Sequence, residues 1–158
     1  MKLPKAIVKE GVEAEVIDAL EKESFQICID PDISVPSLEL NPELRKYLFY
    51  AKSMGEMVVS YESIEKELAA ERKGLQNVGN QSDRISRLLI VTNDGSPRFY
   101  KELKFLQHKE GQRVLICRLN IDSLKMGEIL NKPGVPIKAI LINRKSSVVN
   151  VLKALQID

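Results

Sequence analysis

Three aspartate residues follow apolar segments of the sequence and could together bind a divalent cation. Asp30 and Asp32 come after the segment FQICI, and Asp94 comes after LLIVTN. Ligands of open α/β sheets bind outside the carboxyl ends of the strands, so side chains that follow parallel strands gather at one edge. Carboxylate oxygens suit Mg²⁺ and Mn²⁺, and such an ion polarises a phosphodiester bond. The sequence therefore predicts a Mg²⁺ or Mn²⁺ site formed by Asp30, Asp32 and Asp94.

Hydroxyl and basic side chains beside the segment LLIV could bind the phosphate groups of a ligand. Thr92 and Ser96 follow this segment, and a serine before a proline is a typical helix start, where backbone N–H groups attract anions. Arg98 and Lys101 fall in the first turns of that helix and could bind phosphate oxygens. These four residues are the predicted phosphate-binding set. The alternative for Arg98 and Lys101 is an ordinary solvated helix face.

Each acidic candidate also has a purely structural interpretation. Aspartates at strand ends commonly accept hydrogen bonds from backbone amides in turns, which is the alternative for Asp30 and Asp32. For Asp94 the two interpretations are closer, because Ser96 already supplies a helix cap and leaves the carboxylate available. Glu67 lies within EKELAAERK, where acidic and basic residues at helical spacing are typical of a solvated, ion-paired face.

The composition excludes several other kinds of site. The 158 residues include 24 basic and 22 acidic side chains, so a nucleic-acid contact would have to be a local patch. One histidine, His108, and two cysteines, Cys28 and Cys117, are too few for a zinc site made of Cys and His ligands. No apolar run is long enough to span a bilayer, and the N-terminal segment is charged throughout. We therefore expect a cytoplasmic protein without a membrane partner.

The elements that must position these residues alternate between strand and helix patterns. Five apolar runs have the character of buried strands: Phe25 to Asp30, Met57 to Ser60, Leu88 to Asp94, Val114 to Leu119 and Ile137 to Asn143. Helix start and stop signals lie between them, and residues 1–24 contain an N-terminal helix. This order predicts a doubly wound, mostly parallel five-stranded sheet with helices on both faces. We expect a single α/β domain over residues 1–158, with a mobile loop at 75–83.

The order of these segments resembles the PIN-like ribonucleases, including their NYN branch. The resemblance rests on ICIDPD, VVSYESIEKEL and LLIVTND, and it covers roughly residues 25–143. It implies a Mg²⁺-dependent nuclease in which Asp30 and Asp94 are metal-binding acids. It also implies that Glu67 corresponds to the glutamate that many members of this family contribute to the site from a helix. Asp30, Asp94 and Glu67 therefore form the predicted catalytic set.

Residues 87–155 also resemble the kink-turn RNA-binding family of ribosomal proteins. RLLIVTNDGSPRFYKEL is similar to a strand that ends in acidic residues and leads into a helix, and Met126-Gly127 stands where that family has Leu-Gly. The family's Gly-x-Asn-Glu signature has only the segment GLQN at 74–77 as a counterpart. This second resemblance implies a protein that binds RNA.

The sequence leaves three functional hypotheses open. The first is a PIN-like, metal-dependent ribonuclease, or a relative of one that has lost its activity. The alternative is a non-catalytic α/β module that binds RNA or a protein partner. The third is a structural domain that forms a homo-oligomer, because a fold of this class does not by itself fix a function.

Overall fold

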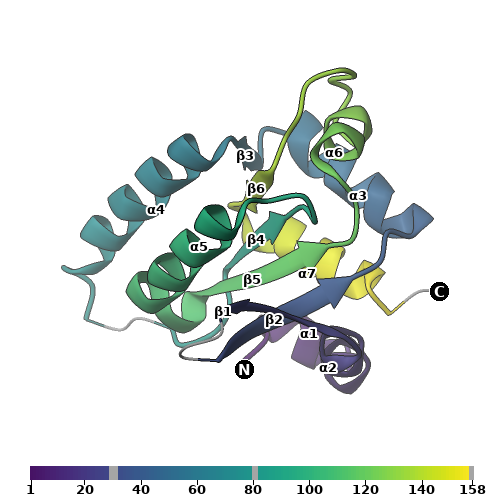
Figure 1. Ribbon diagram of the computed structural model, residues 1–158. Coiled ribbons are helices and arrows are strands. Elements are labelled where there is room, and N and C mark those ends of the chain that lie inside the picture. The colour runs from purple at the N-terminus through teal and green to yellow at the C-terminus, as the bar shows by residue number, and fades with distance from the viewer. Residues whose placement is uncertain (29–31, 80–81, 157–158) are drawn as a thin grey trace.

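A mixed six-stranded sheet lies at the centre of the molecule, with helices on both of its faces (Figure 1). In this computed structural model, residues 1–28, 32–79 and 82–156 are described. The strand order across the sheet is β1-β2-β5-β4-β6-β3. The strands are β1 (Ser24–Cys28), β2 (Ile33–Leu38), β3 (Met57–Val59), β4 (Arg87–Val91), β5 (Val114–Leu119) and β6 (Ala139–Ile142).

The directions of the strands determine which loops meet. β5 is parallel to β4 and to β2, whereas the pairs β1–β2, β4–β6 and β6–β3 are antiparallel. Val91 at the end of β4 pairs with Arg118 near the end of β5 and with Ala139 at the start of β6. Val59 at the end of β3 pairs with Ile140. The segments that follow β3, β4 and β5 therefore meet the segment that precedes β6 at one edge of the sheet.

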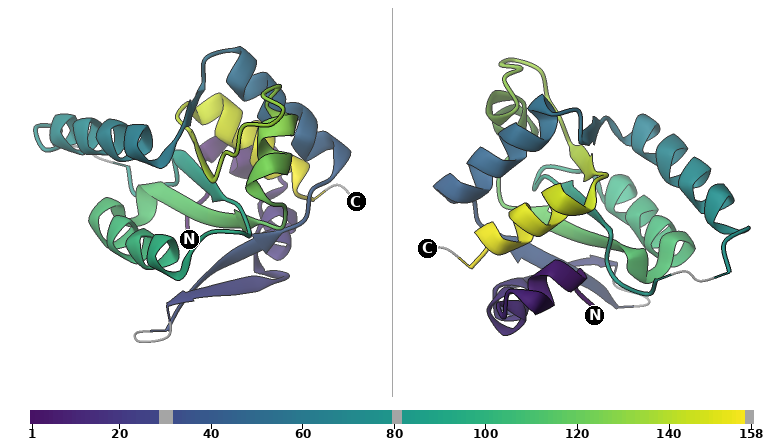
Figure 2. Two further views of the ribbon diagram at one scale, coloured as in Figure 1. Left: turned by 45° about the horizontal axis from the view of Figure 1, so that its top comes forward. Right: turned by 180° about the vertical axis from the view of Figure 1, so that it is seen from behind.

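Helices cover the two faces of the sheet unequally. They are α1 (Lys5–Lys9), α2 (Glu13–Glu21), α3 (Pro42–Ser53), α4 (Tyr61–Leu75), α5 (Pro97–Glu110), α6 (Ser123–Ile129) and α7 (Lys145–Ala154), with a short 3₁₀ turn at Gly111–Arg113. One apolar cluster joins the sheet to α4 and α5, and a larger cluster joins it to the other helices. The right-hand view of Figure 2 shows α7, α3 and the N-terminal helices on the near side.

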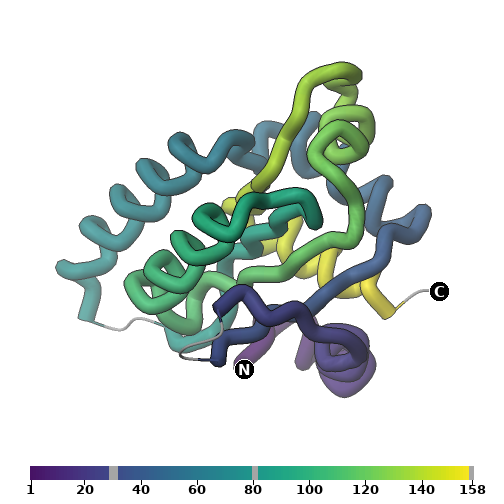
Figure 3. Tube along the Cα trace, viewed as in Figure 1, coloured from purple at the N-terminus to yellow at the C-terminus, as the bar shows by residue number. Residues whose placement is uncertain are grey.

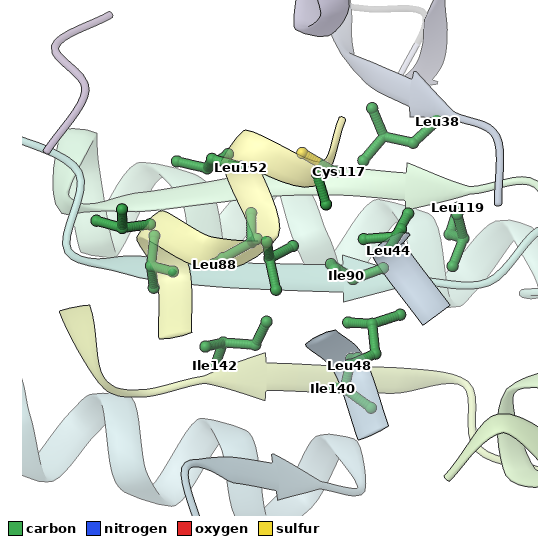
Figure 4. Packing of buried hydrophobic residues seen from close by; sticks show 14 of the residues in the cluster. Leu38, Leu44, Leu48, Leu88, Ile90, Cys117, Leu119, Ile140, Ile142 and Leu152 are labelled. Carbon is green, nitrogen blue, oxygen red and sulfur yellow. The ribbon is translucent and has the colours of Figure 1, made fainter. Parts of the chain in front are cut away.

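Alternation along the central strands supplies both clusters. Leu88 and Ile90 of β4 belong to the larger cluster, and Leu89 and Val91 belong to the cluster under α4 and α5. Because successive side chains of a strand point to opposite faces, a strand covered on both sides is apolar throughout. Cys117 of β5 lies in the larger cluster, as Figure 4 shows, and complete burial raises the pKa of its thiol.

The predicted fold class is confirmed, with two differences in detail. The sheet has six strands and is mixed, because β1 and β2 form an antiparallel hairpin and β6 runs against β4. The added strand, β2, contains Pro36, and a proline disfavours a strand at the sequence level. The N-terminal helix is two short helices, α1 and α2.

The predicted loop 75–83 overlaps α4 by one residue, Leu75, and its other described residues lie in no helix or strand. Its predicted mobility stays a prediction. Among the described helices, none combines the length and the apolar composition that crossing a bilayer requires.

Candidate functional site at the edge of the sheet

Four segments form the edge at which the predicted ligand would bind, and we call this edge the rim. The rim consists of Ser60 after β3, residues 92–96 after β4, residues 120–123 after β5, and residues 131–138 before β6. Loops at the carboxyl ends of parallel strands are the usual ligand-binding position in α/β sheets. Figure 3 shows how the chain leaves α6 and returns through the last of these segments to β6.

Asp94 lies in the rim but is held by neutral hydrogen-bond donors. Its Oδ1 accepts a hydrogen bond from Thr92 Oγ1 at 2.7 Å, and its Oδ2 accepts two from Ser123, from the hydroxyl at 2.7 Å and the backbone N–H at 3.1 Å. Partial desolvation acts to raise the pKa of Asp94, but the bonds from Ser123 and Thr92 outweigh it and hold the pKa below its usual value. The carboxylate therefore joins the β4–α5 turn to the start of α6.

Thr92 and Ser96 complete the same turn. Thr92 is fully buried, and its carbonyl accepts a hydrogen bond from the Tyr100 hydroxyl at 2.9 Å. That hydroxyl in turn accepts one from the backbone N–H of Gly95 at 3.1 Å. Ser96 caps α5, since its Oγ accepts a hydrogen bond from the Phe99 N–H. Thr92 therefore faces the interior rather than a ligand, whereas Ser96 occupies the predicted position at a helix N-terminus.

In the described structure, no other predicted acid lies beside Asp94. Asp32 immediately precedes β2, and the far end of β2, Leu38, pairs with Leu119 near the rim. The six residue steps from Asp32 to Leu38 span about 20 Å of extended chain, which separates Asp32 from the rim. Asp32 is exposed and accepts a hydrogen bond from Gln26 at 2.6 Å. Asp30 lies outside the described residues.

Glu67 has a structural partner on a different part of the sheet. Its Oε2 accepts a hydrogen bond from the side-chain amide of Asn143 at 2.7 Å, so it joins α4 to the residue after β6. Since β6 is antiparallel to β4, Asn143 lies at the edge opposite the rim. Within the described ranges, no three His, Cys, Asp or Glu side chains are placed to share a metal ion. The Mg²⁺ or Mn²⁺ prediction, which includes Asp30, stays untested.

The two predicted phosphate-binding cations lie on the exposed side of α5. Arg98 is almost fully exposed and forms only a long ion pair, 3.8 Å, with Glu102. Lys101 is also exposed. Both follow the rim closely in sequence, in the first and second turns of α5. Among the described residues, neither is held in a fixed position by a short contact.

A feature of the rim that the sequence analysis missed is the loop of residues 131–138. The N–H groups of Lys132, Val135 and Ile137 donate to the carbonyls of Gly127, Lys132 and Ser123 at 2.8, 3.1 and 3.0 Å. Asn131 and Gly134 have positive φ angles of 61° and 81°. The loop is therefore fixed by its own backbone, and the signal for it was the segment NKPGVP, with two prolines and a glycine.

Gly127 explains how closely this loop lies against α6. A Cβ atom built on Gly127 would be 1.9 Å from the carbonyl oxygen of Val135. Only glycine allows such an approach, so the Met126-Gly127 pair noticed in the sequence has a steric role. Ile137 is buried and anchors the end of the loop, while Val135 keeps 48% of its surface exposed.

The fixed loop presents cations and apolar surface together. Lys132 and Lys138 are exposed at its two ends, and among the described residues neither ammonium group has an ion-pair partner. The adjoining turns add side-chain amides, because Asn93 donates to Asn120 at 3.0 Å and Asn120 donates to Glu39 at 3.0 Å. The rim can therefore offer positive charge, hydrogen-bond donors and one exposed apolar side chain to a ligand.

The opposite edge of the sheet is built differently. There Arg113 binds Glu71 at 2.8 Å and Glu110 at 2.6 Å, Arg87 binds Glu71 at 3.1 Å, and Arg72 also binds Glu110. The side chain of Glu110 has no exposed surface. A cavity of about 1120 Å³ adjoins this network, between the ends of α1, α4 and α7.

Comparison with known proteins provides structural likenesses only. No protein-family model and no curated protein matches the sequence. A solved structure of a protein of unknown function from Bacillus halodurans C is 14% identical, with a TM-score of 0.53, and covers 75% of this chain and 100% of its own. A Giardia lamblia 15.5kD RNA binding protein is 17% identical, with a TM-score of 0.49, over 74% of this chain and 88% of its own. At such low identity, the first of these likenesses establishes a shared fold and nothing about function.

Proposed function

We propose that this protein is a non-catalytic RNA-binding module and that the rim is its RNA-binding surface. The observation that carries the proposal is the fixed loop 131–138. It holds two lysines, without an ion-pair partner among the described residues, on either side of an exposed apolar side chain. RNA-binding proteins combine contacts to phosphates with apolar contacts to unstacked bases, and a preformed loop makes both without an ordering cost.

The surroundings of Asp94 support binding rather than metal-dependent cleavage. A carboxylate that already accepts three hydrogen bonds has fewer lone pairs to offer a cation. Among the described residues, the two acids predicted to act together with Asp94 are Asp32 and Glu67. Both lie away from the rim. The resemblance of residues 87–155 to the kink-turn RNA-binding family points to the same ligand class, because it spans Asp94, Gly127 and the loop.

Fluorescence anisotropy with two RNA probes tests the proposal. One probe is a labelled RNA duplex that contains a kink-turn, and the other is the same duplex with full pairing. We expect the double variant Lys132→Ala, Lys138→Ala to bind the kink-turn RNA about tenfold more weakly at moderate salt. We also expect its plot of log affinity against log salt to lose about two units of slope, because each lysine neutralises a phosphate.

A matched control distinguishes a site from general charge. Lys73 and Lys109 are exposed lysines on α4 and α5, and the double variant Lys73→Ala, Lys109→Ala makes the same change in net charge. The proposal predicts that this control binds like the unaltered protein. Equal weakening in both double variants, or no binding of either RNA at low salt, would refute it. RNA cleavage that needs Mg²⁺ or Mn²⁺ and is abolished by Asp94→Asn would instead support the ribonuclease hypothesis.

A further inference from the structure

The outer side of α3 carries aromatic side chains that the fold does not cover. Leu44, Leu48 and Ala51 form the buried side of this helix, with at most 1% of their surface exposed. On the other side, Phe49 and Tyr50 keep 41% and 48% of their surface exposed. α3 lies at the outside of the molecule in both views of Figure 2.

These two rings lie close to each other and to a third, partly buried ring, Tyr47. The ring centroids of Phe49 and Tyr50 are 6.5 Å apart, and those of Tyr50 and Tyr47 are 6.2 Å apart. The ammonium group of Lys46 lies 5.2 Å from the centroid of Tyr47 and 5.9 Å from that of Tyr50. Phe49 and Tyr50 lie three and four residues after Lys46, so both share one side of the helix with it. We call Lys46, Tyr47, Phe49 and Tyr50 the α3 stripe.

The charges around the α3 stripe are mostly positive and only loosely paired. α3 contains three basic residues, Arg45, Lys46 and Lys52, and one acidic residue, Glu43. The ion pairs of Arg45 with Glu128 and of Lys46 with Glu43 are both 3.9 Å long, and all four side chains are at least 37% exposed. Such pairs contribute little and are readily exchanged for another anion.

Aromatic rings with lysine or arginine beside them suit a single-stranded nucleic acid. Bases stack on exposed rings whatever their sequence, and the neighbouring cations contact the phosphates. A second copy of this chain fits the same surface poorly. A symmetric contact through the α3 stripe would bring two positively charged helices together, and like charges at an interface oppose association.

We propose that the α3 stripe binds unpaired nucleotides of an RNA strand by stacking on Phe49 and Tyr50, with Lys46 and Arg45 contacting the phosphates. In naming RNA as the ligand, this inference rests on the proposed function. The site itself is separate, because it lies on α3 and includes no residue of the rim.

Tryptophan fluorescence gives a direct test, because the chain contains no tryptophan. The variant Phe49→Trp places a single reporter in the α3 stripe at a side chain that is 41% exposed. Titration with an oligouridylate of about ten nucleotides should quench its emission through base stacking. In anisotropy measurements with the same oligonucleotide, the double variant Phe49→Ala, Tyr50→Ala should bind at least tenfold more weakly.

A matched reporter on another helix serves as the control. Phe105 of α5 is 54% exposed and has Lys104 5.5 Å from its ring centroid, but no other aromatic ring adjoins it among the described residues. The variant Phe105→Trp should be quenched much less by the oligouridylate. Equal quenching of both reporters would overturn the inference, since it would mean non-specific contact.

Two further measurements separate the failure of this site from the failure of the rim. Quenching of Phe49→Trp should persist when Lys132→Ala and Lys138→Ala are added. Absence of quenching in a protein that still binds the kink-turn RNA would overturn the α3 proposal and leave the proposed function intact. Sedimentation of a dimer that Phe49→Ala, Tyr50→Ala converts to a monomer would also overturn it, because the stripe would then be a protein interface.

Discussion

The two edges of the sheet differ in how their charged side chains are paired. Where β4 and β5 begin, three arginines and two glutamates bind one another and leave little charge for a ligand. Where the same strands end, the carboxylate of Asp94 is held by hydroxyl and amide donors, and Lys132 and Lys138 stay unpaired among the described residues. The ionic network therefore joins elements of the fold at one edge, whereas Lys132 and Lys138 at the rim remain available to a partner.

The largest effect should come from breaking the ion-pair network. Glu110→Ala leaves Arg113, whose side chain is only 13% exposed, without one of its two partners. Removing one partner of a buried pair typically costs about 3–5 kcal/mol, and we expect a loss of about 3 kcal/mol in the free energy of unfolding. Urea denaturation followed by circular dichroism measures it. Glu102→Ala, which removes an exposed pair with Arg98, should cost less than about 1 kcal/mol.

The contact between Gly127 and the rim loop should be the next most sensitive point. Gly127→Ala places a Cβ atom against the Val135 carbonyl, so the loop must shift, and overpacking of this kind costs about 1–3 kcal/mol. Binding of the kink-turn RNA should weaken as well. Gly74→Ala in α4 is the matched control, because no described atom lies within 4 Å of its added Cβ and alanine favours a helix. Unchanged stability and binding in Gly127→Ala would contradict the assigned role of the loop.

Asp94 should give a smaller effect that depends on pH. Its folded-state pKa is lowered, so its ionised form contributes stability above its unfolded pKa, and that contribution is lost as the pH falls through the folded pKa. Asp94→Ala should lower the free energy of unfolding by about 1 kcal/mol at pH 7, and the difference from the unaltered protein should shrink at more acidic pH. Asp18→Ala, at an exposed position of α2, serves as the control in the same urea titrations. A difference that grows on acidification would contradict this account.

Ser60 should give the smallest effect, and in the stabilising direction. Its φ angle of 76° is one that glycine adopts without strain, and its Oγ accepts a long hydrogen bond, 3.4 Å, from the Ser63 N–H. Relief of strain is worth about 1 kcal/mol and loss of the cap to glycine only a few tenths, so Ser60→Gly should raise the free energy of unfolding by about 0.5 kcal/mol. Thermal unfolding would show a rise in Tm, and a fall would indicate that the cap matters more than the backbone strain.

The sequence predicted the buried strands better than their directions. Apart from Arg87 and Arg118, β4, β5 and β6 are apolar because both faces of the sheet are covered, and this pattern is visible in the residues themselves. β2 contains two serines and Pro36, so no such pattern marked it. That β6 runs against β4 follows from how the chain returns after α6, which no local pattern encodes.

The candidate site was predicted only in part, for a related reason. Asp94 stood out because it follows a buried strand, but its partner Ser123 lies 29 residues further along the chain, and only the folded structure brings the two together. The importance of residues 131–138 depends on a steric contact with Gly127 that composition cannot indicate. The turn-forming residues of the loop can be recognised in the sequence, whereas its rigidity cannot.

The position of Cys117 has a practical consequence for measuring all of these effects. Its thiol lies in the interior of the central sheet and is held in its unreactive, protonated form, whereas Cys28 is partly exposed near the end of β1. Alkylation of Cys117 must therefore wait until the sheet opens. The rate at which mass spectrometry finds Cys117 alkylated would report how often the core opens under native conditions, without any denaturant.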